Sequence, residues 1–169
     1  MLRRLFARLT ERADRGAALF EALVDEARKP HWFVEGAVPD SVDGRFAMLA
    51  TVVALATVRL ESVSDDTRLA SVALTERFIA AMDAEHRQMG VSDPAIGKTV
   101  RKLVGALARR VALWRDSGSG EAWRETTARS VYGDGPVSRF ALGHTASKLA
   151  LLKERLATAS DADLIEGSI

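Results

Sequence analysis

Three histidines and a few acidic residues are the side chains in this sequence that could hold a metal ion or move protons. None of the histidines, His31, His86 and His144, has a second histidine three or four residues away. Metal sites in helical bundles repeat a Glu-x-x-His pattern, whereas this chain offers a single Asp83-x-x-His86. Asp83 and Glu85 are two residues apart and fall on different sides of a helix. The spacing therefore predicts no metal site and no paired-carboxylate catalysis.

The stretch GVSDPAIGKT ends like a phosphate-binding loop. Such a loop needs G-x-x-x-x-G-K-[ST] after a strand, but the position of its first glycine is Ser92, and Pro94 lies inside. The chain has no cysteine, which excludes disulfides and thiol chemistry, and no serine lies in a G-x-S-x-G nucleophile elbow. We expect a protein that is not an enzyme and that takes no cofactor and no small-molecule substrate.

Residues 98–115 are the segment best suited to an anionic partner, because they contain six basic residues and no acid. On a helical wheel Lys98, Arg101, Lys102 and Arg109 share one arc, opposite an apolar arc. The net charge of the whole chain is only +1, so any electrostatic function depends on such local segregation. The pattern fits an ordinary solvated face, or a docking face for an acidic protein, RNA or anionic lipid.

The turn VPDSVDGRF crowds Asp40, Asp43 and Arg45 in front of the apolar run 46–58. Pro39 favours a turn, and Asp43 is placed to cap the following helix, where its negative charge suits the helix N-terminus. The planar fork of Arg45 can pair with Asp40 or Asp43. We expect one polar cluster whose first role is structural, with Arg45 partly buried against the aspartates.

Composition and periodicity predict an all-α, single-domain bundle of about six to seven helices. The chain has 169 residues, 28% charged and 47% hydrophobic, which is typical of globular domains. We expect helices near residues 2–14, 16–29, 46–60, 64–90, 92–115, 121–131 and 136–159. The run 46–60 has no polar face, so it should be the buried central helix, and it is too short to span a membrane. Residues 1–160 are expected to form the domain and residues 161–169 an acidic, frayed tail.

Two stretches resemble the ubiquinol–cytochrome c chaperone family. PHWFVEGAVPDSVDGRFAML carries the family's V-P-D-[TS]-x-D-G-R-F pattern, and AAMDAEHRQMGVSDPAIGKTVRKL carries its M-D-x-x-x-R-x-M-G-V-x-D pattern. ARSVYG is similar to the family's A-R-N-x-Y-G, with Ser130 in place of asparagine. The resemblance covers about residues 17–133.

The resemblance implies an all-α, non-enzymatic assembly factor of ubiquinol–cytochrome c reductase. Its implied client is newly made cytochrome b or another membrane subunit, with a small partner protein and a ribosome or membrane-surface contact as further partners. It implies a cytoplasmic location, peripheral to the inner membrane. The candidate contact residues are Trp32, Phe33, Val38, Asp40, Asp43 and Arg45 of the turn and Lys98, Arg101, Lys102 and Arg109 of the basic helix. The alternative is an all-α nucleic-acid- or ribosome-binding module that uses residues 98–115.

Overall fold

The fold is built from helices throughout residues 16–62, 65–88 and 93–169, which are the residues that the structure, a computed structural model, describes. Within these ranges there is no strand, which confirms the all-α prediction. The helix expected at residues 2–14 lies outside them. The elements are α2 Ala17–Ala27, α3 Pro30–Phe33, α4 Val42–Glu61, α5 Asp65–Gln88, α6 Asp93–Arg115, α7 Glu121–Thr127, the π-helix η1 Ala128–Tyr132, α8 Arg139–Thr158 and α9 Asp161–Glu166.

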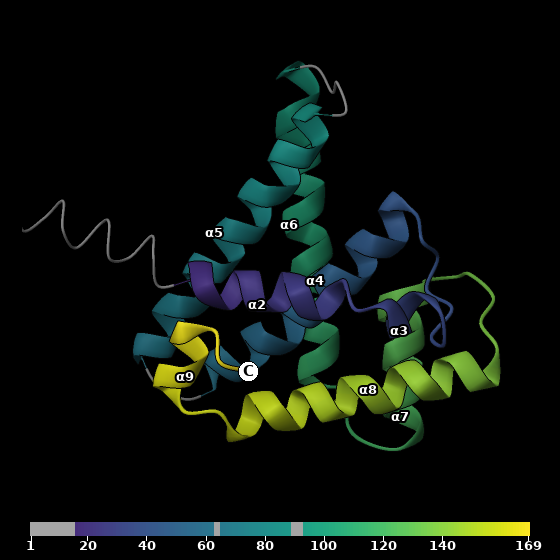
Figure 1. Cartoon of the computed structure of the whole chain (residues 1–169). Helices are drawn as coiled ribbons and strands as arrows, with labels where there is room; N and C mark the ends of the chain where they lie inside the picture. The colour runs from purple at the N-terminus through teal and green to yellow at the C-terminus, as the bar shows by residue number, and fades with distance from the viewer. Residues whose placement is uncertain (1–15, 63–64, 89–92) are drawn as a thin grey trace, which may run out of the picture.

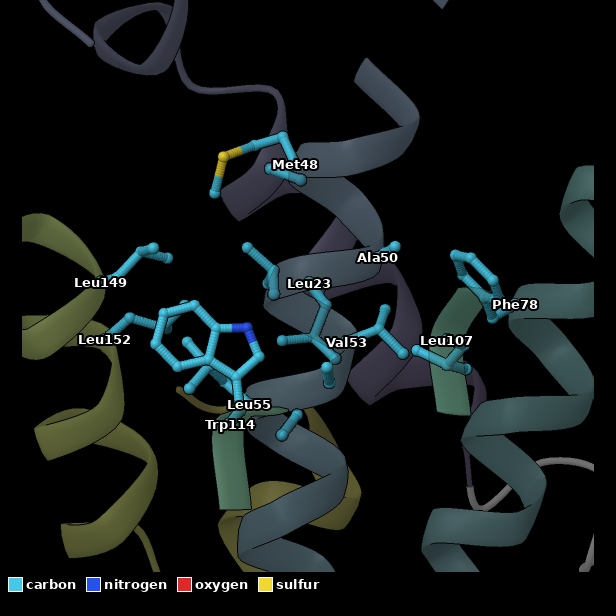
Figure 2. Packing of buried hydrophobic residues seen from close by; sticks show 14 of the residues in the cluster. Leu23, Met48, Ala50, Val53, Leu55, Phe78, Leu107, Trp114, Leu149 and Leu152 are labelled. Carbon is cyan, nitrogen blue, oxygen red and sulfur yellow. The ribbon is translucent and has the colours of Figure 1, made fainter. Parts of the chain in front are cut away.

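Helix α4 runs through the middle of the molecule, as the sequence predicted. Every residue from Ala50 to Ala56 is at most 5% exposed. The helix contacts α2, α5, α6, η1 and α8, so a neighbour covers each of its sides. Figure 1 shows α5 and α6 side by side and extending past the other helices, while α8 runs along the opposite side of the molecule. Figure 2 shows the core at closer range, with side chains of α2, α5, α6 and α8 packed against α4.

The two threonines inside α4 do not disturb its burial, because their hydroxyl groups are hydrogen-bonded. Thr51 Oγ1 donates to the carbonyl oxygen of Ala47 at 2.7 Å, and Thr57 Oγ1 donates to that of Val53 at 2.8 Å. A buried hydroxyl without such a partner would be costly, and bonding to the carbonyl four residues back is the usual solution in a helix. The apolar run can therefore remain helical to its end.

Several helix boundaries differ from the sequence-based expectation. Helix α4 begins at Val42 rather than near residue 46, because the Ser41 hydroxyl caps it. Helix α8 begins at Arg139 rather than at Pro136, because Ser138 Oγ accepts from the Ala141 N–H at 3.1 Å. Proline 30 follows α2 as expected, but it also opens the one-turn helix α3, a position that proline favours.

The expected frayed tail is wrong for residues 161–166, which form helix α9. Ser160 Oγ accepts from the Asp163 N–H at 3.1 Å, and an Asp163 carboxylate oxygen accepts from the Ser160 N–H at 3.2 Å. This reciprocal capping box satisfies the first turn. Leu164 is only 1% exposed, and α9 contacts α2 and α5. The tail is therefore docked on the bundle.

Candidate docking surfaces

The turn between α3 and α4 is held by contacts that require its particular residues. The Val38 N–H donates to the Trp32 carbonyl oxygen at 3.0 Å. Ser41 Oγ accepts from the Gly44 N–H at 3.2 Å, which makes Ser41 the N-cap of α4. A Cβ atom on Gly44 would overlap the carbonyl oxygen of Pro39. The shape of this turn thus explains the serine and the glycine of the V-P-D-S-x-D-G-R-F pattern.

The charged residues of the turn face solvent, which corrects two expectations. Ser41, not Asp43, caps α4, and Asp43 lies in the first helical turn, where its charge still favours the N-terminus. Arg45 Nε donates to Asp40 Oδ1 at 2.6 Å, with the two side chains 68% and 61% exposed, so the partly buried Arg45 that we expected is wrong. The hydrogen bond from Arg45 lowers the pKa of Asp40 below its usual value.

The apolar residues expected at the outer edge of this turn mostly point inward. Trp32 is 0% exposed, and its Nε1 donates to the Glu26 carbonyl oxygen at 2.7 Å. Val38 is 2% exposed, and Phe33 packs partly buried against the core. Burial removes Trp32 and Val38 from the surface that a partner could touch, because the chain folds back through α3 to hold the turn.

Substitutions in the turn should separate its cap from its surface charges. We expect Ser41→Ala to lower the melting temperature by about 2–4 °C, because losing an N-cap costs about 1 kcal/mol. Asp40→Ala and Arg45→Lys should each change it by less than about 2 °C, since an exposed ion pair adds little. Thermal unfolding followed by circular dichroism checks this. A larger loss in Arg45→Lys than in Ser41→Ala would mean that the ion pair, not the cap, holds the turn.

The outward face of α6 carries the four basic residues that the helical wheel grouped together. Lys98, Arg101, Lys102 and Arg109 are all exposed, whereas Leu103, Leu107, Val111 and Trp114 on the other side are buried. The two other basic residues of this helix have structural partners. Arg115 pairs with Glu61, and Arg110 Nη2 donates to the Ser130 carbonyl oxygen at 3.0 Å.

Ser130 is the centre of a buried polar network that joins η1 to α4 and α6. Its Oγ lies 2.6 Å from Thr51 Oγ1 and accepts from Trp114 Nε1 at 3.0 Å. The guanidinium of Arg110 lies 5.7 Å from the centre of the Phe46 ring. The ARSVYG segment therefore joins η1 to α4 and α6 through the hydroxyl and the carbonyl oxygen of Ser130.

A pair of histidines links α3 to α8, and the sequence contained no local signal for it. His31 Nδ1 lies 3.2 Å from His144 Nε2, although 113 positions separate them. Beside them the Tyr132 hydroxyl donates to the Gly36 carbonyl oxygen at 2.5 Å and lies 2.7 Å from Thr145 Oγ1. Within the described residues no group of three or more histidine, cysteine, aspartate or glutamate side chains could hold a metal ion, and the side chain of His86 lies outside them.

Acid should weaken the attachment of α3 to α8. Burial is the largest cause that lowers the pKa of His31 below 6.5, followed by the charges of His144, Lys148 and Lys29, while Glu26 opposes them. The folded chain therefore binds this proton less tightly than the unfolded chain, so stability present above pH 6.5 is lost as the pH falls below it. We expect the melting temperature to fall between about pH 7.5 and about pH 5.5, and to fall less in His31→Gln. If the melting temperature falls equally with pH in the wild type and in His31→Gln, His31 is not the cause of the acid sensitivity.

The described chain is thus an all-α bundle with exposed charged faces on α6 and on the turn before α4. It belongs to the ubiquinol-cytochrome C chaperone family, whose model matches residues 35–168. The match includes the turn, the basic helix and the Ser130 segment, so the family resemblance of the sequence is confirmed.

A solved structure with the same fold is the crystal structure of the Cbp3 homolog from Brucella abortus. The two chains superpose with a TM-score of 0.78 over 100% of this chain and 95% of the other, at 23% sequence identity. This likeness confirms the fold. Among curated proteins, none matches the chain significantly.

Proposed function

We propose that this member of the chaperone family holds newly made cytochrome b during the biogenesis of ubiquinol–cytochrome c reductase, without catalysing a reaction. The observation that carries the proposal is the family match over residues 35–168. A chaperone needs a client, and the resemblance of the sequence implies a membrane subunit of ubiquinol–cytochrome c reductase. Cytochrome b is the subunit that the sequence resemblance implies.

The exposed edge of the turn before α4 supports a role in client contact. Asp40, Asp43 and Arg45 are exposed, while Ser41 and Gly44 fix the backbone that carries them. Charges on a backbone that is already ordered lose little conformational entropy when they bind. We propose that these three residues, with the partly buried Phe33, contact polar segments of the client.

The place of action follows from the client. Within the described ranges, no helix is both long enough and apolar enough to span a bilayer. We propose that the protein works at the cytoplasmic side of the inner membrane, where a membrane subunit is made and inserted. The exposed cations of α6 favour contact with an anionic surface there.

The same four cations favour the second candidate, a ribosome or RNA contact through α6. Lys98, Arg101, Lys102 and Arg109 lie on one exposed helical face, and each phosphate that they neutralise would release a counterion. Binding to RNA would therefore weaken steeply with salt, whereas client binding should keep a salt-insensitive apolar part.

The proposal is tested by crosslinking and pull-down from native membranes. Cytochrome b should be recovered with the wild-type protein, and less of it with Asp40→Ala, whose fold should be intact. Asp134→Ala is the matched control, because Asp134 is also an exposed aspartate in a loop. Recovery of ribosomal components without cytochrome b would favour the second candidate. Equal recovery of cytochrome b with all three proteins would support cytochrome b as the client but would show that the turn is not part of its binding site.

A further inference from the structure

One face of α8 is only partly covered by the rest of the molecule. Phe140, His144, Lys148, Leu151 and Arg155 follow one another at intervals of three or four residues, which places them on one side of the helix. His144 touches His31 of α3, and Arg155 Nη2 lies 2.6 Å from Glu26 Oε2 of α2. These two contacts show that the face is turned toward the α2–α3 edge (Figure 1).

Between and beyond these two contacts the face stays open. Leu151 is 52% exposed and Phe140 is 76% exposed, which makes them two of the large apolar side chains that the bundle leaves in water. A groove of about 630 Å³ lies along α8 beside Leu151. From Phe140 to Arg155 the helix rises about 22 Å, a length that a partner helix of about four turns could cover. Leu151 is the apolar residue of its lining, and the other lining residues are charged or polar, so an occupant needs an apolar face with charged side chains beside it, as an amphipathic helix has.

The charges around Leu151 are unequal at the two edges of the groove. Glu26 is already neutralised, because Lys29 Nζ and Arg155 Nη2 lie 2.8 Å and 2.6 Å from its carboxylate. Burial alone would raise the pKa of Glu26, but the hydrogen bonds from Arg155 and Lys29 outweigh burial and lower it. This acid therefore offers little negative charge to a partner.

Lys148 is the charge that remains available near one edge. No ion pair joins it to any residue that the structure describes. Its charge, like that of Lys29, lowers the pKa of His31. Lys148 is therefore the unpaired cation at this edge of the groove, since Lys29 is held by Glu26 and the lowered pKa of His31 favours its neutral ring. At the other side of Leu151, Glu154 is exposed and would repel a second carboxylate there.

We propose that this groove between α8 and the α2–α3 edge binds an acidic amphipathic helix of another protein. The apolar side chains of that helix cover Leu151 and Phe140, and a carboxylate beside them pairs with Lys148. Glu154 sets the orientation, because it disfavours a carboxylate at the opposite edge. This surface goes beyond the proposed client site, since none of its residues lies in the turn before α4 or on α6.

The test uses the full chain and a labelled synthetic helical peptide of about 15 residues, with leucines on one face and glutamates beside them. Fluorescence anisotropy should show binding that weakens about tenfold when the glutamates are replaced by glutamine, the effect of one good charge contact. Lys148→Glu and Leu151→Ser should each weaken binding about tenfold. Lys153→Glu is the matched control, because Lys153 is on the same helix but lies over the Trp123 ring, and it should bind as wild type.

Three results would overturn the proposal. The first is no binding of the acidic peptide, or equal binding of the acidic and glutamine peptides. The second is that the chain binds phosphatidylglycerol vesicles but not the peptide, and that Lys148→Glu abolishes the vesicle binding. The groove would then be a lipid-headgroup site. The third is that the wild-type chain sediments as a dimer and that Leu151→Ser sediments as a monomer. A second copy of the chain would then be the occupant of the groove. Circular dichroism of each variant confirms that its helices are intact.

Discussion

Replacing Gly44 with alanine should lower the melting temperature by about 6–12 °C. The added Cβ would overlap the Pro39 carbonyl oxygen, and other Pro39 atoms crowd the same space. Backbone cannot rotate aside as a flexible side chain can, so the turn or the first turn of α4 must shift. Overpacking of this kind costs about 3 kcal/mol, and each kcal/mol corresponds to about 2–4 °C in a chain of this size.

Gly143→Ala is the matched control for this prediction. Gly143 also lies in a helix, α8, but a Cβ added there meets nothing within 4 Å. Alanine should be neutral or stabilising at that position, by up to about 1 kcal/mol. Thermal unfolding of both variants gives the answer, and equal melting temperatures would contradict the close approach of Gly44 to Pro39. The same pair measured in client pull-downs shows whether the shape of the turn matters for binding.

Trp32→Ala should be the second strongly destabilising substitution, lowering the melting temperature by about 10 °C or more. The indole is 0% exposed and donates to the Glu26 carbonyl oxygen at 2.7 Å. Truncating a buried tryptophan costs about 3–5 kcal/mol, because it leaves a cavity and removes apolar contact. Here it would also detach α3 from α2.

Phe140→Ala is the control for Trp32, since that ring is 76% exposed, and its melting temperature should stay within about 2 °C of wild type. The comparison also decides what Trp32 does. If Trp32→Ala captures the client normally at a temperature well below its melting point, its role is structural. Unchanged stability with lost capture would instead show that Trp32 contacts the client, as the family resemblance implied.

The helices themselves were predictable because their patterns are local. The run around Val53 has no polar face and became the central helix, and the wheel of residues 98–115 separated Lys98 and Arg109 from Leu103 as the structure does. The cap of α4 was predicted wrongly as Asp43, because Ser41 and Asp43 are both good capping residues and lie two positions apart. Backbone geometry, which the sequence does not display, selected Ser41.

The parts that were not predicted depend on contacts between distant segments. Leu164 is buried because α9 packs against α2. The Ser160-x-x-Asp163 capping pattern at the start of α9 indicated a helix, but the acidic composition of the tail favoured a frayed end. His31 and His144 meet only after α3 and α8 have packed. Trp32 was a candidate contact residue only through the family resemblance, whereas the chain folds back and buries it.

Timing of client binding is the property that most directly tests the account of this protein as a chaperone of new cytochrome b. Newly made proteins would be pulse-labelled in cells, and this protein would be pulled down at intervals during the chase. We expect labelled cytochrome b to be recovered at the earliest times and to disappear from the pull-down as it enters ubiquinol–cytochrome c reductase. Association that starts only with mature cytochrome b, or no labelled cytochrome b at any time, would contradict the account.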